Sequence, residues 1–518
     1  MDKQYSKNTG IIPLFGVTDY VMFVLTLLIS CSIGIFYAFV DRHKNTTKEF
    51  LLGGQSMNPI PVAFSLMVTF MSAMTLLGNP AEVYNFDTMW WWIIVGMVLA
   101  MWSTTRIFIP FFYNLKVESV FEYLHMRFNK EIRVIGSVIL IVQTLIYMAF
   151  LLYAPSLALN AVTGVHLWGS VVGMGCVVTF YTTVGGMKAV VWTDTFQAGV
   201  IVAGLLAVLI QGSIVQGGFV KAWETAYSND RIRFDNFSLD PKTRHSVWSM
   251  VFGGWAFWMH LYGVNQAQVQ RCLSCSTVRK AQIAMWINMP GLAFIVSACC
   301  MIGVVMYAFY ADCHPITYGL VAKTDQLVPL YVMDVLGNYP GLPGIFVSCV
   351  ISGSLSSLSS GLNALAAVTL RDLLQQSCVR SVGEFRSTIT SKCIVVFYGL
   401  LSIGLAYVAS HLGSVLEAVY TVFGILNGPV LGVFTLGMFF PWANKHASFG
   451  AMCGLLASLA FLFWIGIGAF VSGERALLSP TYVTGCNFTA KPLPASAANL
   501  TAVVNGTANH RYVIVART

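Results

Sequence analysis

Charged residues are scarce in this chain of 518 residues, where they make up 10% of the total against 57% hydrophobic residues. Soluble domains carry about 25% charged residues, so this scarcity excludes an ordinary soluble protein. Segments of about ten residues with alternating polarity, which a membrane β-barrel requires, are also absent. The chain has instead a series of apolar stretches of about 20 residues, each long enough to cross a bilayer as a helix. We therefore predict an all-α polytopic membrane protein.

The sequence predicts neither a secretory signal nor a zinc site, and it suggests one disulfide. The apolar stretch that begins at Asp19 is too long for a secretory signal and lacks a small-residue cleavage site, so we expect a retained membrane helix. Cys272 and Cys275 form a CxxC, but no second pair follows at zinc spacing, and we expect no metal site there. Cys313 and Cys486 fall in segments that we place outside the cell, where a disulfide between them could persist.

Hydropathy divides the chain into twelve predicted membrane helices. Their approximate bounds are 19–40, 59–78, 89–112, 134–162, 167–184, 194–213, 246–265, 281–310, 341–369, 393–410, 415–437 and 449–471. With the N-terminus outside, the inner loops carry 16 Lys and Arg residues and the short outer segments carry 3. The positive-inside rule therefore favours an extracellular N-terminus at 1–18, a membrane domain at 19–471 and an extracellular tail at 472–518. The tail is rich in Ala, Pro, Asn and Thr, and we expect it to be disordered.

Glycosylation sequons agree with this orientation, because glycan addition requires the luminal face. Four of them fall outside: Asn236, Asn487, Asn499 and Asn505. Asn45 belongs to a fifth sequon that falls inside, and we expect it to be unmodified.

The stretch "SGSLSSLSSGLNALAAVTLRD" at 352–372 places six serines within nine residues of a predicted membrane helix. A single serine in such a helix is best explained by close packing and a bond back to the i−4 carbonyl. Six serines and Asn363 also offer oxygen ligands to a hard monovalent cation. The 59–78 helix carries Ser65, Thr69, Ser72 and Thr75 between prolines, which suits either a discontinuous helix or an ordinary packed one.

Three other polar positions leave two interpretations open. Asp194 begins a predicted helix, where it could be an N-cap or an ion ligand. Trp258 and Tyr262 stand at i, i+4, which suits core packing or one wall of a substrate cavity. Glu417, near Tyr420 at a helix start, could be functional or simply hydrated at the interface.

Four motifs resemble the sodium/solute symporter family, in the branch of multivitamin, monocarboxylate and iodide transporters. They are "FMSAMTLLGNPAEVY" (70–84), "FYTTVGGMKAVVWTDTFQ" (180–197), "YGVNQAQVQR" (262–271) and "SGSLSSLSSGLNALAAVTLRDL" (352–373). The likeness runs from about residue 10 to residue 475. It implies a LeuT-type fold with two inverted five-helix repeats, roughly 59–213 and 246–437, and a break in the 59–78 helix. Relatives usually have one more helix and a cytoplasmic tail after the glycosylated loop, whereas this sequence stops at "HRYVIVART".

The resemblance also implies the functional residues. Sodium would bind the carbonyls of Val68, Met71 and Gly353 and the hydroxyls of Ser356 and Ser357. Ser359 and Asn363 would support that site, and Tyr147, Asp194 and Gln197 would form a polar cluster on the sodium exit path. The substrate cavity would be lined by Phe70, Thr75, Ile94, Met97, Trp258, His260, Tyr262, Leu416, Glu417 and Tyr420.

The implied function is sodium-coupled import of a small organic anion across the plasma membrane by alternating access. Sodium is the coupling ion, no other cofactor is implied, and a monocarboxylate or a vitamin such as biotin or pantothenate is the expected substrate. Glu417 and His260 depart from the relatives, which usually carry Gln and a small polar residue there, while Thr75 stands where the iodide branch carries Gln. Iodide transport and a sodium-gated sensor or leak protein stay open as alternatives. An enzyme is not expected, because no nucleophile, base and orienting group share a site.

Overall fold

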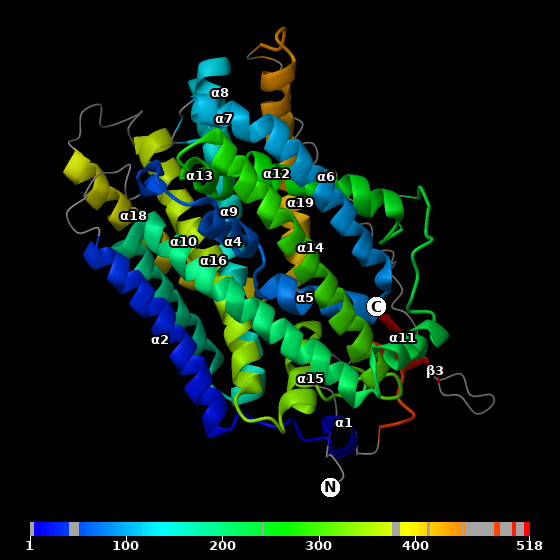
Figure 1. Cartoon of the computed structure of the whole chain (residues 1–518). Helices are drawn as coiled ribbons and strands as arrows, with labels where there is room; N and C mark the ends of the chain where they lie inside the picture. The colour runs from blue at the N-terminus through cyan, green and yellow to red at the C-terminus, as the bar shows by residue number, and fades with distance from the viewer. Residues whose placement is uncertain are drawn as a thin grey trace.

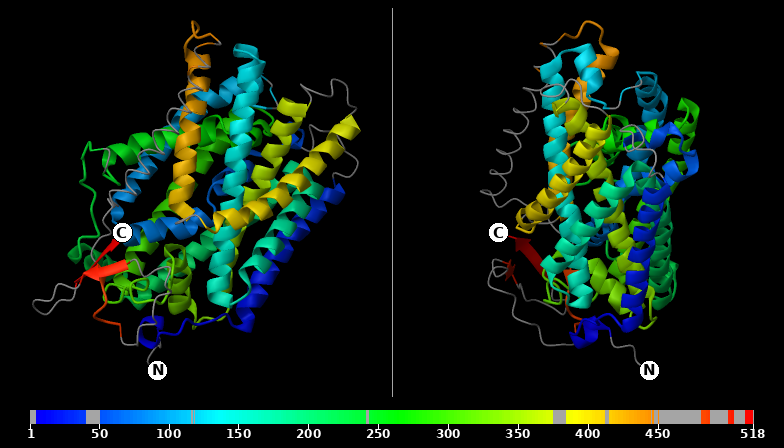
Figure 2. Two further views of the ribbon diagram at one scale, coloured as in Figure 1. Left: turned by 180° about the vertical axis from the view of Figure 1, so that it is seen from behind. Right: turned by 90° about the vertical axis from the view of Figure 1, so that its left-hand side faces the viewer.

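The apolar stretches form helices, because a helix satisfies all of its own backbone hydrogen bonds within the hydrocarbon. The computed structural model describes residues 5–40, 51–115, 117, 119–240, 243–374, 384–411, 415–444, 446, 450, 481–486, 500–503 and 512–517. Most of them lie in helices that run between the two ends of an elongated bundle (Figure 1, and from two other sides in Figure 2).

The helices follow one another along the whole described chain, and the labels η mark short 3-10 and π turns. In the first half they are α1 (Ser6–Thr9), α2 (Val17–Val40), η1 (Gly53–Gln55), α4 (Pro59–Thr69), α5 (Ala73–Asn85), η2 (Thr88–Trp92), α6 (Ile93–Ser103), η3 (Thr104–Phe108), α7 (Ile109–Leu115), α8 (Glu122–Arg127), α9 (Lys130–Thr163), α10 (Leu167–Val215) and α11 (Phe219–Ser228). In the second half they are η4 (Ser249–Gly253), α12 (Gly254–Gly263), α13 (Gln266–Leu273), α14 (Val278–Phe309), η5 (Thr324–Gln326), α15 (Leu327–Leu336), α16 (Leu342–Val368), η6 (Thr369–Leu374), α18 (Glu384–Ala409) and α19 (Val415–Phe439).

The predicted membrane segments are helical wherever they are described. In the described ranges nine helices are long and apolar enough to cross a membrane, and the bent pair of α4 and α5 would make a tenth. The segment predicted at 246–265 is helical as η4 and α12 over residues 249–263, which is shorter than a full crossing. Of the segment predicted at 449–471, the structure describes residue 450 alone.

The loop predicted at 185–193 is wrong for most of its length. α10 continues through this region with a sharp backbone break at Gly186, where φ is 62° and ψ is −161°. Residues on either side form two separate apolar spans, Leu167–Val184 and Gly186–Val215. Glycine adopts a positive φ at no steric cost. The break at Gly186 therefore separates the two spans, where the hydropathy pattern predicted a loop of nine residues.

The serine-rich helix α16 lies at the centre of the bundle. In its most apolar 18-residue window 94% of the residues are buried, against 11% for the corresponding window of α2. α2 runs along the flank of the bundle beside α10 (Figures 1 and 2), with large side chains such as Phe36 and Phe39 exposed. Small residues along α16 let its neighbours approach closely, because close packing drives helix association in a membrane.

Two helices are broken near the middle of the bundle. α4 ends at Thr69 and α5 begins at Ala73, with a bend of 55° between them. The Thr75 hydroxyl donates to the Phe70 carbonyl (3.1 Å), which the break has removed from the helical pattern. The second break separates α12 from α13, where the Asn265 side chain accepts from the Ala267 N–H (2.9 Å) and so caps α13.

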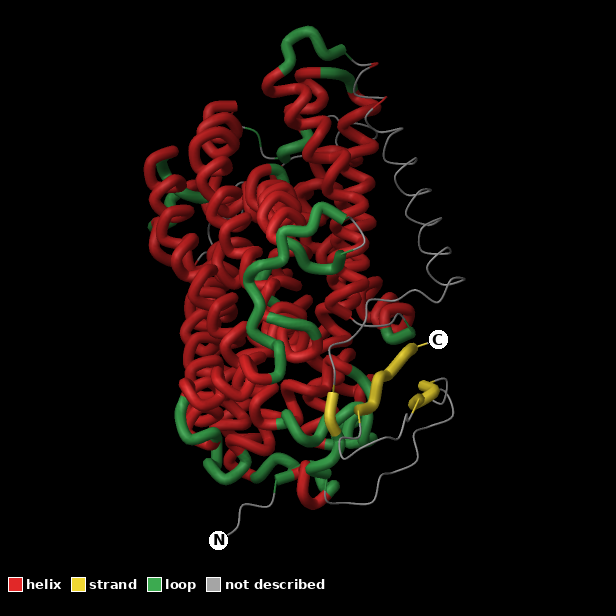
Figure 3. Tube along the Cα trace, turned by 90° about the vertical axis from the view of Figure 1, so that its right-hand side faces the viewer, coloured by secondary structure: helices red, strands yellow, loops and turns green. Residues whose placement is uncertain are grey.

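The N-terminal segment, α11 and α15 lie at one end of the bundle (Figure 1), the end that carries the N-terminus in Figure 3. The first residues are fixed there by Asp334 on α15, which accepts from both the N–H and the hydroxyl of Ser6 (2.7 and 2.6 Å). A disulfide joins Cys313 to Cys486 at the same end. These contacts tie the N-terminal segment and the tail to one rigid surface.

The tail differs from the disordered segment expected from its composition, in the parts that the structure describes. Strands β1 (Thr481–Tyr482), β2 (Leu500–Val503) and β3 (Tyr512–Arg517) form an antiparallel sheet in the order β1-β3-β2. The residues of β3, "YVIVAR", are mostly β-branched or aromatic, and the His314 N–H donates to the Tyr482 carbonyl (2.9 Å). Local strand preference and the tether at Cys486 therefore outweigh the polar composition of the tail as a whole.

Candidate functional site

The residues predicted to bind sodium meet where α16 crosses the α4–α5 break. The Ser357 hydroxyl donates to the Thr69 carbonyl (2.5 Å) and lies 3.0 Å from the Gly353 carbonyl. Gly353 packs against the break so closely that a Cβ there would lie 2.5 Å from the Met71 carbonyl oxygen. Carbonyl and hydroxyl oxygens are the ligands of hard cations, so the crossing has the chemistry of a sodium site.

The remaining predicted ligands belong to the same crossing. The Val68 carbonyl accepts from the Met71 N–H (3.2 Å), which closes a tight turn at the end of α4. The Ser356 hydroxyl is buried and has no hydrogen-bond partner among the described residues. An unpaired buried hydroxyl is costly, so an oxygen-seeking cation or a water molecule beside Ser356 would stabilise the site. The Ser354 hydroxyl on the same helix accepts from the Ala73 N–H (3.3 Å) at the start of α5.

Asp194 lies in a fully buried ionic cluster that the sequence reasoning missed. The Arg271 guanidinium pairs with the Asp194 carboxylate (3.1 Å), and its Nε donates to the Ser65 hydroxyl (2.6 Å). Ser65 in turn donates to Asp194 (2.6 Å), and Ser360 accepts from the guanidinium. The cluster joins α4, α10, α13 and α16 around the same end of the serine face. Arg271 had been counted as a charge in an inner loop, because α13 is too short and too rich in glutamine to look like a buried helix.

The other residues predicted near the exit path are buried polar groups. Both polar atoms of the Gln197 and Asn363 side chains lack partners among the described residues, as does Asp194 Oδ1. Ser359 donates to the Ser356 carbonyl (2.9 Å), and the Tyr147 hydroxyl lies beside the hydroxyls of Ser72 and Ser357. Buried polar groups that lack partners commonly bind ordered water, so this region has the character of a hydrated path.

The predicted substrate-cavity aromatics form a connected set of ring contacts. Phe70 at the break lies 6.1 Å from Tyr147 and 6.4 Å from Tyr262, and Tyr262 lies 6.0 Å from Trp258. The set continues through three rings that sequence reasoning missed: Trp90, Phe257 and Phe423. Trp90 is the first of three consecutive tryptophans, and that cluster was the signal for a functional wall.

The other residues predicted to line the cavity differ in burial. Met97 and His260 are buried and Ile94 is half-buried. The His260 Nδ1 atom has no partner among the described residues. Leu416 packs on Gly78, where a Cβ would lie 2.9 Å from the Leu416 Cδ1 atom. The side chain of Glu417 lies outside the described residues, so its predicted place in the cavity stays a prediction.

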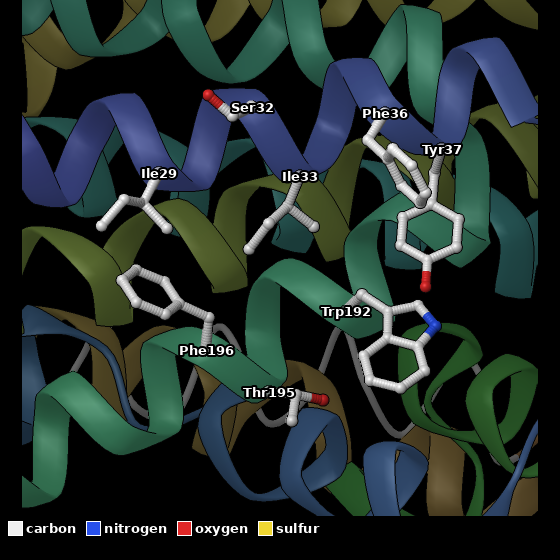
Figure 4. Close-up of a pocket in the computed structure, with 8 residues that line it drawn as sticks. All are labelled: Ile29, Ser32, Ile33, Phe36, Tyr37, Trp192, Thr195 and Phe196. Carbon is white, nitrogen blue, oxygen red and sulfur yellow. The ribbon is translucent and has the colours of Figure 1, made fainter.

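A separate groove lies between α2 and α10 on the flank of the bundle (Figure 4). It is lined by Ile29, Ser32, Ile33, Phe36, Tyr37, Trp192, Thr195 and Phe196. Trp192 stacks on Tyr37 with ring centroids 6.0 Å apart. None of these residues belongs to the sodium or substrate predictions, and their apolar, exposed character fits a surface that faces lipid.

Comparison with known proteins identifies the family of the chain. The family model of the Sodium:solute symporter family matches residues 50–458. The chain belongs to this family. The symporter is 46% identical to sodium-coupled monocarboxylate transporter 1 of Xenopus laevis, over 93% of its own length and 77% of that protein's. It is 44% identical to the sodium-dependent multivitamin transporter of Oryctolagus cuniculus, over 92% of its length and 74% of that protein's.

A solved structure shows the same fold. The substrate-bound outward-open state of a Na⁺-coupled sialic acid symporter superposes with a TM-score of 0.77, covering 86% of this chain and 92% of that one at 23% identity. The symporter therefore has the LeuT-type fold that the sequence motifs implied. It is a multi-pass membrane transporter, not an enzyme, and it couples the movement of a small-molecule substrate to that of Na⁺.

Proposed function

We propose that the symporter imports a small monocarboxylate across the plasma membrane, with its N-terminus outside the cell. The observation that carries this proposal is the start of α5. The N-terminal N–H groups of a helix lack intrahelical partners and favour anions, and Ser72 at the N-cap position of α5 makes no side-chain hydrogen bond to them. A substrate carboxylate at this point would lie next to the sodium ligands on the other side of the break, so that the two charges compensate.

Biotin and pantothenate form a second class of candidate substrate. Each carries one carboxylate, so the same anchor at α5 serves them, and identity to the multivitamin transporter is close to that for the monocarboxylate transporter. The residue-by-residue assignment is part of the proposal: Val68, Met71, Gly353, Ser356 and Ser357 hold sodium, with support from Ser359 and Asn363. Tyr147, Asp194 and Gln197 lie on its exit path.

In the proposed alternating-access cycle, the affinities for sodium and for substrate are linked. Sodium that binds the break from outside raises the affinity for substrate, and substrate raises the affinity for sodium by the same factor. The repeats at 59–213 and 246–437 then rock against each other, and sodium leaves where it is scarce. Each net positive charge that enters across 100 mV, interior negative, contributes roughly 2.3 kcal/mol, so sodium ions in excess of the anion's charge support its accumulation.

Uptake in oocytes tests the substrate. Lactate, butyrate, biotin, pantothenate, iodide and choline are offered in sodium buffer and in sodium-free buffer, at two external pH values. We expect sodium-dependent accumulation of lactate or butyrate, and accumulation of biotin or pantothenate would select the vitamin class. Sodium-dependent uptake of iodide alone would overturn the proposal, and current without accumulation would indicate a sensor or leak protein.

A double substitution tests the sodium ligands. Ser356→Ala with Ser357→Ala removes both hydroxyls that the proposal assigns to sodium, so the sodium concentration for half-maximal uptake should rise by at least tenfold or uptake should vanish. Ser352→Ala on the same helix is the matched control, because Ser352 is equally buried but lies a turn away from the break. Surface biotinylation verifies equal expression. An unchanged sodium dependence in the double variant would refute this site.

A further inference from the structure

A group of ionisable side chains lies apart from the sodium site, at the end of the bundle that carries α11 and α15. It consists of Glu82 on α5, Asp87 before η2, and Arg244 and His245, and we call it the His245 cluster. Arg244 Nε lies 2.7 Å from Glu82 Oε1. His245 Nε2 lies 3.1 Å from the same oxygen, and His245 Nδ1 lies 3.7 Å from Asp87 Oδ1. Glu82 and His245 are both buried.

The geometry suits a protonated imidazole. A neutral imidazole carries one N–H and can satisfy one carboxylate, whereas both nitrogens of His245 face carboxylate oxygens. Glu82 and Asp87 raise the pKa of His245 above its usual value, although burial acts in the opposite direction. The pairing is therefore complete below the usual pKa of about 6.5 and is lost as the pH rises through the raised pKa.

His245 also touches the wall of the predicted substrate cavity through one ring. Its imidazole packs on Trp90 with centroids 5.5 Å apart, and Trp90 packs edge-on against Tyr420, also at 5.5 Å. Phe86 contacts the imidazole from another side at 5.7 Å. The orientation of the Trp90 indole therefore depends on where His245 is held.

The chain segment that carries His245, residues 229–248, crosses over the end of α5 and η2. At its start Arg231 donates to the carbonyls of Tyr84 and Asn85 (2.9 Å each). Near its end the Asn236 amide donates to the His245 carbonyl (2.8 Å). Arg244 beside His245 is also held by Glu82, so a change in the charge of His245 alters the position of the imidazole and leaves the segment attached.

We propose that His245 is a positioning residue for the transport cycle: its protonated form holds Trp90 against Tyr420 and so completes the outer wall of the substrate cavity. This inference rests on the proposed substrate cavity. Glu82, Asp87 and Arg244 are the charged groups that face His245 among the described residues, and Tyr420 is the titratable group behind Trp90. Deprotonation leaves the imidazole with one carboxylate partner in place of two, loosens Trp90 and weakens substrate binding from outside.

The experiment compares external pH profiles in oocytes at fixed sodium and voltage, using the compound from the uptake panel with the largest sodium-dependent uptake. In the wild-type symporter the KM should rise about three- to tenfold between pH 6.5 and 9, with little change in the maximal rate. His245→Gln should give a flat profile at the high KM. His245→Lys, which stays charged over this range, should give a flat profile at the low KM. His411→Gln is the control, because His411 is exposed and distant from the cluster in sequence.

Asp87→Asn keeps the cap on η2 but removes one carboxylate that stabilises the charged imidazole. It should shift the midpoint of the KM profile to lower pH, an effect that a merely structural role would not produce. A wild-type pH dependence that persists in His245→Gln overturns the proposal, as does a His245→Lys profile that follows the wild type.

Voltage-dependent charge movement with sodium alone separates this inference from the proposed function. Its midpoint should shift with external pH in the wild type and not in His245→Gln, and this requires no substrate. Failure of every panel compound with an intact pH shift overturns the proposed substrate class alone. Absence of that shift in the wild type overturns the role of His245.

Discussion

At the scale of single residues, Arg271 carries a buried charge that needs several specific partners. It is fully buried, and its charge is compensated by Asp194 and by the hydroxyls of Ser65 and Ser360. Removing one partner of a buried pair typically costs 3–5 kcal/mol, about the scale of a domain's whole stability. The residue is therefore expected to be intolerant of substitution.

Arg271→Gln should lower surface expression and melting temperature and should abolish sodium-dependent uptake. Arg271→Lys should have an intermediate effect, because lysine keeps the charge but not the planar fork that reaches four partners. Arg279→Gln, at an exposed position at the start of α14, is the matched control. Combination with Asp194→Asn should cost less than the sum of the two single changes. Additive costs would contradict the pair.

Gly353→Ala tests the close approach of α16 to the break. The added methyl would lie 2.5 Å from the Met71 carbonyl oxygen, so helix and break must separate. Overpacking of this kind costs about 1–3 kcal/mol, and we expect a higher half-saturating sodium concentration together with a lower melting temperature. Gly404→Ala on α18, where a Cβ would meet open space, should leave both unchanged. Normal sodium dependence in Gly353→Ala would contradict the approach.

Sequence reasoning found Ser356 and Ser357 because six hydroxyls in a membrane helix violate the composition rule for lipid. It did not find Arg271 or Trp90. In the sequence of a membrane protein, a positive charge usually indicates a loop, and a tryptophan usually indicates a position at the membrane interface. Only the tertiary arrangement shows that four helices converge on Arg271 and that Trp90 faces Tyr420.

At the scale of elements, the break between α4 and α5 depends on Thr75. Thr75→Val keeps the shape but leaves the Phe70 carbonyl without its 3.1 Å donor, at a cost of about 1 kcal/mol. We expect a lower melting temperature in detergent and weaker sodium binding, because the same turn orients the carbonyls of Val68 and Met71. Thr75→Ser retains the donor and should behave as the wild type. Equal behaviour of the two variants would contradict this role.

The first break could be anticipated from the sequence, whereas the second could not be located. Hydroxyls and flanking prolines indicate where a membrane helix can lose hydrogen bonds, and the 59–78 segment has both. The α12–α13 break at Val264 and Asn265 is followed by a glutamine-rich helix, which hydropathy assigns to a loop. The hydropathy analysis also did not identify α15 as a buried helix, because its ten residues are too few to cross a membrane. Every one of them is nevertheless buried.

At the scale of the whole molecule, the orientation in the membrane is open to a direct test. If the N-terminus is outside, glycosidase treatment of surface-labelled protein should reduce its mass, and Asn236→Gln should remove one glycan. Asn236 lies on the segment that crosses α5, and its amide donates to the His245 carbonyl. Asn45→Gln, at a site outside the described residues, should leave the mass unchanged. A glycan on Asn45 would reverse the topology.

Composition and charge predicted a bundle of membrane helices, and the motifs predicted its LeuT-type fold. Hydropathy reports which segments enter the membrane but not which neighbours they choose there. The central place of α16 and the peripheral place of α2 differ eightfold in burial, although both segments are strongly apolar. The disulfide between Cys313 and Cys486, by contrast, joins the two cysteines that the predicted topology places outside.

One carbonyl oxygen on the first broken helix accepts hydrogen bonds from both parts of the second. The Leu66 carbonyl oxygen on α4 accepts from the Tyr262 hydroxyl and from the Gln268 amide, both at 3.2 Å, so it is bonded to each side of the second break. A main-chain oxygen is present whatever residue occupies position 66, and either donor can be lost while the other remains. The contact between α4 and the α12–α13 pair therefore consists of two independent hydrogen bonds. A substitution at any one of these three positions leaves at least one of them in place.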